Sequence, residues 1–133
     1  MTSLFLLFLL IILVILSGFL SGSETAITAT SKARILYKKK KGSKRAGYVL
    51  ELLDKKDNVI STLLLSNNLV NILASSLATA FFYDLFGVEG IFYATLIMTV
   101  VIVIFAEVLP KTYAINRPNR TALLIAPIIY YLN

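Results

Sequence analysis

The sequence contains no cysteine and no histidine. The absence of cysteine excludes disulfide bonds and thiolate metal sites. The absence of histidine removes the commonest transition-metal ligand and the commonest general base of enzymes. Any metal site in this chain must therefore be built from oxygen atoms, which favours hard cations such as Mg²⁺, Ca²⁺ or Na⁺.

Apolar residues are abundant instead. They make up 58% of the 133 residues, and the mean hydropathy is +0.83, well above the range of soluble domains. Because the apolar residues fall in long blocks, we expect one all-α membrane domain over residues 1–133. The blocks predict three transmembrane helices and a shorter juxtamembrane helix, with a truncated fourth span as the alternative for the last of these. The expected spans are 4–30, 59–82 and 90–116, and the juxtamembrane helix is 118–132.

Positive charge is confined to two parts of the chain. All 13 Lys and Arg residues lie in the segment 31–58 or after Glu107. The positive-inside rule therefore places the N-terminus outside and both basic segments in the cytoplasm of a multi-pass protein of the plasma or inner membrane. We interpret the lysine-rich segment as a solvated loop that touches anionic lipid headgroups rather than nucleic acid. Within it, a short interfacial helix is expected near 47–53.

A carboxylate stands near the end of the third predicted span. Glu107 there costs several kcal/mol unless it has a partner. Pro110 has no N–H, so in an α-helix it leaves the carbonyl of Ala106 without its usual partner. Together these two oxygen groups favour a hard cation. The alternative is a structural ion pair between Glu107 and Lys111, four residues on.

Polar side chains on the other two spans lie at a similar predicted depth. At about 1.5 Å per helical residue, Ser21 is about 14 Å, Asn67 about 12 Å, Asn71 about 18 Å and Glu107 about 14 Å from the cytoplasmic ends. Asparagine and serine in a span commonly hydrogen-bond neighbouring helices, and they also supply oxygen ligands to a bound ion. Both interpretations stay open on this evidence.

Three segments, one on each span and in the same order, resemble the signature segments of the cyclin-M/CorC transmembrane domain. They are Ser21-Gly22-Ser23-Glu24-Thr25-Ala26, then Leu65-Ser66-Asn67-Asn68-Leu69-Val70-Asn71-Ile72, then Ala106-Glu107-Val108-Leu109-Pro110-Lys111-Thr112. The resemblance implies a homodimer of three-helix domains that exports Mg²⁺ by alternating access, coupled to Na⁺ entry. It also implies cytoplasmic CBS domains in the full-length protein, which this chain does not include.

The resemblance also implies which residues bind the cation. The ligand candidates are Ser21, Asn71, the Ala106 carbonyl and Glu107, around a largely dehydrated Mg²⁺. The weaker candidates, for the surrounding shell or for Na⁺, are Ser23, Glu24 and Asn67. Family members usually have glycine at the position of Ala106; the carbonyl is kept, with tighter packing around it.

Two other functions compete with transport. The first is a Mg²⁺-sensing membrane anchor that regulates attached cytoplasmic domains without moving ions. The second is an intramembrane serine hydrolase. We expect no enzyme activity, because histidine is absent and Lys111 lies near a helix end, where the burial that a basic lysine needs is not favoured.

Overall fold

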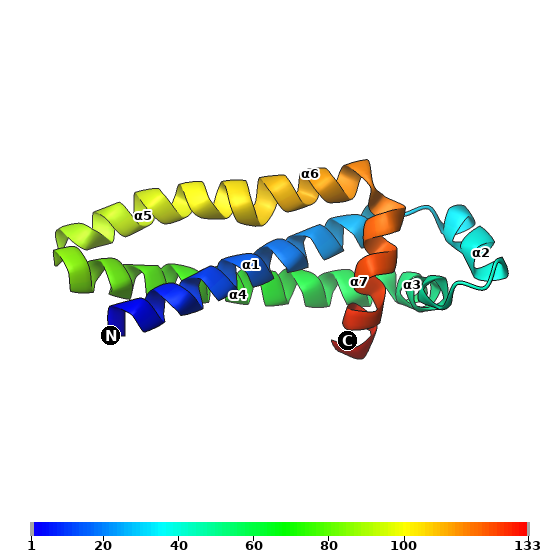
Figure 1. Cartoon of the computed structure of the whole chain (residues 1–133), viewed down its shortest axis with the longest axis horizontal. Coiled ribbons are helices and arrows are strands. Elements are labelled where there is room, and N and C mark those ends of the chain that lie inside the picture. The colour runs from blue at the N-terminus through cyan, green and yellow to red at the C-terminus, as the bar shows by residue number, and fades with distance from the viewer. Residues whose placement is uncertain (1, 133) are drawn as a thin grey trace.

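The computed structural model describes the backbone of residues 2–132 and the side chains of residues 4–131. Every element in the described part of the chain is a helix, which confirms the all-α fold class. Three long rods lie side by side, formed by α1, by α4 and by the continuous run of α5, η1 and α6, and α7 crosses them at one end (Figure 1). In chain order the helices are α1 (Thr2–Ala29), α2 (Lys32–Lys40), α3 (Lys44–Asp54), α4 (Lys56–Phe86), α5 (Glu89–Val101), the π-helix η1 (Ile102–Val108), α6 (Leu109–Asn116) and α7 (Pro118–Leu132).

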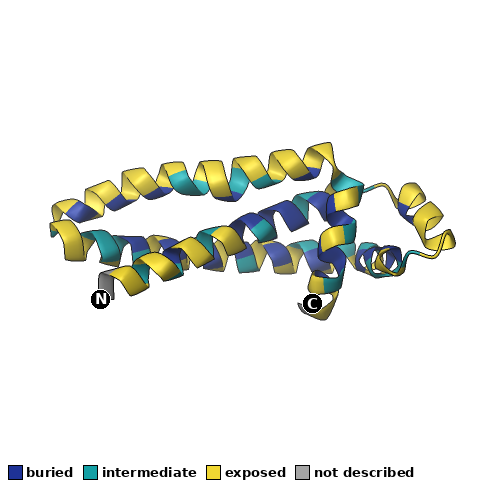
Figure 2. Cartoon of the chain, viewed as in Figure 1, coloured by how far each residue is buried: buried dark blue, intermediate teal, exposed yellow. Residues whose placement is uncertain are grey.

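Three helical segments are long and apolar enough to cross a membrane. They are Leu4–Ala29, Lys56–Phe86 and Glu89–Asn116. Large apolar side chains such as Phe5, Leu65 and Phe92 are exposed along them, and Figure 2 shows how much of the outer surface of the rods is exposed. In a bilayer these faces contact lipid, where apolar exposure is favourable.

The second span is longer than the sequence predicts. The residues after 82 were expected to form a turn, but α4 continues to Phe86. The turn needs little more than Gly87, whose φ of 74° lies in the left-handed region that glycine adopts without strain. The α4–α5 connection is therefore a tight hairpin, which holds the two rods in register.

The basic segment is helical, which corrects the prediction of a loop with one short helix. Ser31 accepts a hydrogen bond from the Arg34 N–H and starts α2, and Ser43 accepts one from the Ala46 N–H and starts α3. Lysine is a good helix former, so a capped lysine-rich segment can fold once its ends are fixed. Gly42, with a φ of 96°, separates the two helices.

The predicted juxtamembrane helix is α7, which lies across the ends of the spans (Figure 1). Its 15 residues extend about 22 Å, too short to cross the apolar core of a bilayer. Pro127 removes the N–H that the Leu123 carbonyl would accept, and the Arg45 guanidinium of α3 donates to that carbonyl at 3.3 Å instead. At its other end, Asn119 Oδ1 accepts from Thr30 Oγ1 at 2.7 Å, so α7 is joined to the end of α1.

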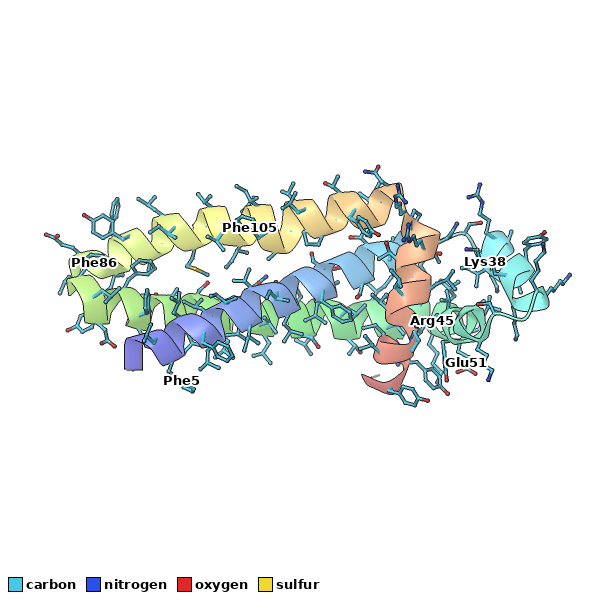
Figure 3. All side chains as sticks on the ribbon, viewed as in Figure 1. Phe5, Lys38, Arg45, Glu51, Phe86 and Phe105 are labelled. Carbon is cyan, nitrogen blue, oxygen red and sulfur yellow. The ribbon has the colours of Figure 1, made fainter. Side chains whose placement is uncertain are left out.

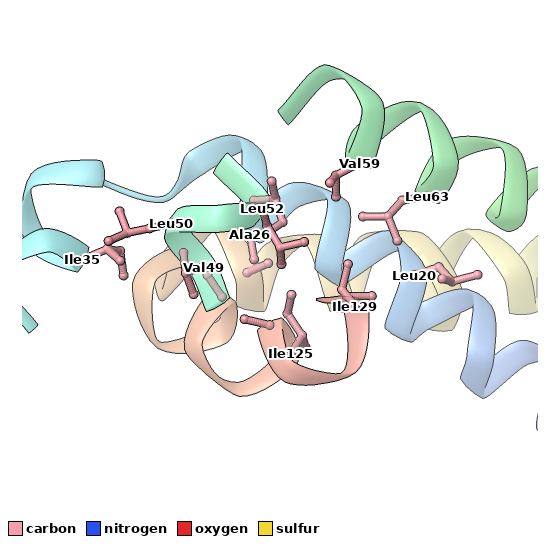
Figure 4. Close-up of a cluster of buried hydrophobic side chains, with 14 of the residues drawn as sticks. Leu20, Ala26, Ile35, Val49, Leu50, Leu52, Val59, Leu63, Ile125 and Ile129 are labelled. Atoms are coloured by element: carbon pink, nitrogen blue, oxygen red, sulfur yellow. The ribbon is translucent and has the colours of Figure 1, made fainter. Parts of the chain in front are cut away.

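Beneath α7 is the larger of two apolar clusters. Side chains of α1, α2, α3, α4 and α7 meet there, and Figure 4 shows their convergence. Ile27, Ile35, Val49 and Val59 are fully buried in it. Because the core gathers where the basic helices join the spans, this end of the bundle is packed more tightly than the rods beyond it.

Candidate cation site at the junction of three helices

One turn-and-a-half of α1 carries small side chains that are almost completely buried. Ser17 is 1% exposed and Ser21 is 0% exposed, and Gly18 and Gly22 stand between and after them. Small residues allow helix backbones to approach closely in a membrane. This segment contacts α4 on one side and the η1–α6 rod on the other, so three spans meet around it.

Toward α4, Ser17 joins two asparagines. Its Oγ lies 2.6 Å from Asn67 Oδ1 and 2.6 Å from Asn71 Oδ1. A hydroxyl has one proton and donates to one acceptor at a time. The three oxygens therefore share one proton, although two of them can only accept a hydrogen bond. Rotation of one amide, or a cation nearby, balances this excess of acceptors. Asn67 and Asn71, both predicted for the site, are thus brought together by a residue that was not predicted.

Toward η1 and α6, the glycines of α1 permit close contact. A Cβ on Gly18 would lie 3.2 Å from Pro110 Cγ and 3.3 Å from the Phe105 carbonyl oxygen, whereas one on Gly22 would lie 3.5 Å from Pro110 Cβ. The first two distances are shorter than ordinary contacts. Gly18 is therefore the point at which the backbone of η1 touches α1.

The π-helix changes which carbonyl Pro110 leaves free. The Leu109 N–H donates to the Ile104 carbonyl, five residues back, instead of to Phe105. The next N–H that could serve Phe105 would be that of residue 110, which is proline and has none. The Phe105 carbonyl therefore lacks a helical donor. The Ala106 carbonyl also loses its α-helical donor, because that donor would be the N–H of Pro110. Single π-turns of this kind are frequent at functional sites.

Ser21 lies between these two contact surfaces. At about 100° per residue, it is about 40° around α1 from Ser17 and about 100° from Gly22, between the side facing α4 and the side facing η1. Its Oγ is buried and has no hydrogen-bond partner among the described residues. Because a buried hydroxyl without a partner is costly, such an atom points to a ligand that completes it.

Glu107 follows Ala106 on η1. Ala106 is 0% exposed against α1, and Glu107 is half-buried beside it. Within the described residues the one ion pair is Lys32–Asp54, at 4.0 Å, so Glu107 is not paired with Lys111. No group of three acidic, histidine or cysteine side chains is present in that part of the chain. Glu107 is thus a half-buried carboxylate without an ion-pair partner among the described residues.

The weaker candidates on α1 differ in position. Ser23 donates to the Phe19 carbonyl at 2.7 Å and lies about 200° from Ser21, so it faces away from the junction. Glu24 is half-buried one turn below Ser21, and its carboxylate has no protein donor among the described residues. The structure thus brings Glu24, but not Ser23, to the side of α1 on which Ser21 lies.

Comparison with known proteins identifies the family of the chain. Residues 8–133 match the family described as the cyclin M transmembrane N-terminal domain (CNNM). The chain belongs to the cyclin M transmembrane family. This membership confirms the family resemblance and, with the three apolar helices, makes the chain a multi-pass membrane protein.

Relatives in several organisms share the domain. The UPF0053 inner membrane protein YfjD of Escherichia coli is 40% identical over 129 residues, covering 89% of this chain and 30% of that protein. A UPF0053 protein of Haemophilus influenzae is 39% identical over 114 residues, covering 86% and 27%. A chloroplastic DUF21 domain-containing protein of Arabidopsis thaliana is 31% identical over 127 residues, covering 94% and 19%. The chain spans less than a third of the length of these relatives.

Three members of the candidate site escaped sequence reasoning. Ser17 could have been found, because it interrupts an apolar run four residues before Ser21 and therefore shares its side of the helix. Gly18 had the same signal, as a small residue four before Gly22. The Phe105 carbonyl had none, since a π-turn shifts the hydrogen-bond register without a residue pattern that reveals it.

Proposed function

We propose that this domain exports Mg²⁺ across the membrane, working as a homodimer by alternating access with Na⁺ entry as the driving force. The observation that carries the proposal is the buried Ser21 hydroxyl, which has no hydrogen-bond partner among the described residues at the point where α1, α4 and η1 meet. The homodimer and the Na⁺ coupling come from the family resemblance. Family membership supports a metal-linked role, and the junction supports an oxygen-bound cation.

The chemistry of the junction suits Mg²⁺ better than a soft metal. Magnesium takes six oxygen ligands at about 2.1 Å and usually keeps several waters. We assign Ser21 Oγ, the Asn71 amide oxygen, the Ala106 carbonyl and the Glu107 carboxylate as its protein ligands, and the Phe105 carbonyl and Asn67 as neighbours that orient them. Glu24, one turn toward the basic end, is our candidate for a Na⁺ ligand.

A single carboxylate also suits release. One Glu107 charge neutralises half of a divalent cation, and dipoles of amide, hydroxyl and carbonyl groups supply the rest of the stabilisation. A cage with two or three carboxylates would hold Mg²⁺ more tightly and slow its departure. The close Gly18–Phe105 contact gives α1 and η1 a surface on which a small displacement opens or closes the cage.

Charge distribution supports an orientation for export. The basic helices α2 and α3 project from one end of the bundle, where Figure 3 labels Lys38 and Arg45. By the positive-inside rule this end is cytoplasmic, the N-terminus is outside, and the membrane is the plasma or inner membrane. Lysines of α2 would contact anionic headgroups, and cytoplasmic CBS domains of a full-length protein would attach beyond α7.

Flux measurements on Glu107 test the proposal. In proteoliposomes, the wild-type protein is expected to carry Mg²⁺. Glu107→Gln is expected to lose Mg²⁺ transport while it still folds and dimerises. The control is Glu89→Gln, which changes an acidic residue at the α4–α5 turn and is expected to transport Mg²⁺ like the wild type. Transport by Glu107→Gln at the wild-type rate would refute the site. A wild type that binds Mg²⁺ without any flux would instead favour the sensing anchor.

A further inference from the structure

A cavity lined by both hydroxyl-bearing and apolar side chains lies beyond the proposed site, between α4 and α5. It measures about 310 Å³, and hydroxyl groups from both helices face it. The hydroxyl residues are Ser75 and Thr79 on α4 and Thr95 and Thr99 on α5. Nothing in the proposed cation site uses these four side chains, so their common orientation needs its own explanation.

The cavity lies about one helical turn from proposed site residues on both of its walls. Ser75 is one helical turn from Asn71, and Val103, which lines the cavity on η1, is one turn from Glu107. Both steps run in the same direction, because α4 and α5 form an antiparallel hairpin. The cavity thus lies between the cation site and the α4–α5 turn, on the side away from the basic helices.

The three threonine hydroxyls of the cavity present acceptors rather than donors. Thr79 Oγ1 donates to the Ser75 carbonyl at 2.9 Å, Thr95 Oγ1 to the Ile91 carbonyl at 3.0 Å, and Thr99 Oγ1 to the Thr95 carbonyl at 2.6 Å. Each of these protons is committed to the helix backbone, so the oxygen lone pairs remain for the cavity. Such bonds also allow a single threonine to face lipid. Here, however, several of these side chains line the same cavity.

Size and polarity agree with a hydrated ion. A water occupies about 30 Å³ in the liquid, so the six waters of a Mg²⁺ shell need roughly 180 Å³. The cavity exceeds this volume. A larger cavity of about 610 Å³ lies between α1 and α5, but its lining is almost wholly apolar, with Leu10, Val14 and Phe81 among its residues. Water and cations gain few contacts there.

We infer that the α4–α5 cavity is an aqueous vestibule, in which the hydroxyl oxygens hold the water shell of a hydrated divalent cation as it leaves the proposed site toward the α4–α5 turn. The direction of movement rests on the proposed function, whereas the presence of water does not. Acceptor oxygens can bind the protons of waters that a Mg²⁺ ion polarises. Rehydration would therefore begin one helical turn away from Glu107, before the cation reaches the membrane surface.

The absence of cysteine from the chain allows a direct test for water. Single variants Ser75→Cys and Thr99→Cys are compared with Ser76→Cys and Val100→Cys, which replace exposed neighbours outside the cavity lining. A charged, membrane-impermeant methanethiosulfonate reacts with thiolates, which form in water, so the cavity variants are expected to react about tenfold faster or more. Equal rates for cavity and neighbour variants would overturn the vestibule.

Transport measurements separate this inference from the proposed function. Ser75→Ala combined with Thr99→Val is expected to bind Mg²⁺ like the wild type and to lower flux about tenfold, since the oxygens that hold the water shell are lost. The matched control is Ser76→Ala with Thr62→Val, because Thr62 makes the same bond to its own helix outside the cavity. Normal flux in the cavity variant, with Glu107→Gln inactive, would refute the vestibule and leave the transport site standing. Fast labelling of the cavity cysteine variants, together with a wild type that moves no Mg²⁺, would refute the transport site and leave the vestibule standing.

Discussion

Replacing Ser21 with alanine should change the free energy of unfolding in opposite directions with and without Mg²⁺. The Ser21 hydroxyl is fully buried and has no hydrogen-bond partner among the described residues. Leaving a buried hydroxyl unsatisfied costs about 1–3 kcal/mol, and alanine is also the better helix former by about 0.5 kcal/mol. In a chelator, Ser21→Ala should therefore raise the free energy of unfolding by about 1.5–3.5 kcal/mol.

In Mg²⁺ the order of the two stabilities should reverse, so that the wild type is more stable than Ser21→Ala. A ligand at about 1,000 times its Kd stabilises the folded protein by about 4.1 kcal/mol. The wild type would gain this energy, whereas Ser21→Ala would gain little because one ligand of the cage is missing. Subtracting the advantage of the variant in chelator leaves the wild type more stable by about 0.5–2.5 kcal/mol in Mg²⁺.

Thermal unfolding of purified protein in detergent measures both quantities. For a domain of this size, 1 kcal/mol corresponds to a shift of about 3–5 °C in Tm. Ser17→Ala, which removes the hydroxyl between Asn67 and Asn71, should lower Tm in both buffers, and Ser76→Ala at an exposed position corrects for helix propensity. If Ser21→Ala in chelator is destabilised as much as Ser17→Ala, the hydroxyl has a partner and the reasoning fails.

Two further predictions concern helix contacts around the site. Gly18→Val places a branched side chain within 3.3 Å of the Phe105 carbonyl and should cost about 1–3 kcal/mol and weaken Mg²⁺ binding, as measured by calorimetry, whereas Gly22→Ala should bind normally. Equal binding by both variants would contradict the contact. Asn119→Ala removes the acceptor for Thr30 Oγ1 and should speed hydrogen exchange at the start of α7, while exchange in α4 stays constant. Unchanged exchange in α7 would count against that connection.

Hydropathy and charge in the sequence were sufficient to predict the three spans and the juxtamembrane helix. A bilayer imposes a length and a polarity on any segment that crosses it, and these can be read residue by residue. The same reasoning selects Glu107 and Asn71, because a polar group in a span is costly wherever it is placed. It also predicts that Pro110 interrupts the hydrogen bonds of its helix, since proline lacks the N–H in every fold.

Only the tertiary structure decided how these groups are combined. The π-turn in η1, which leaves the Phe105 carbonyl without a helical donor, shifts the hydrogen-bond register in a way that no residue type dictates. The contact of Ser17 with Asn67 and Asn71 depends on how α1 and α4 are rotated about their axes. Ser21 could be identified as a hydroxyl in a span from the sequence. That it is buried without a partner among the described residues depends on how three helices meet around it, which no single segment of the sequence reveals.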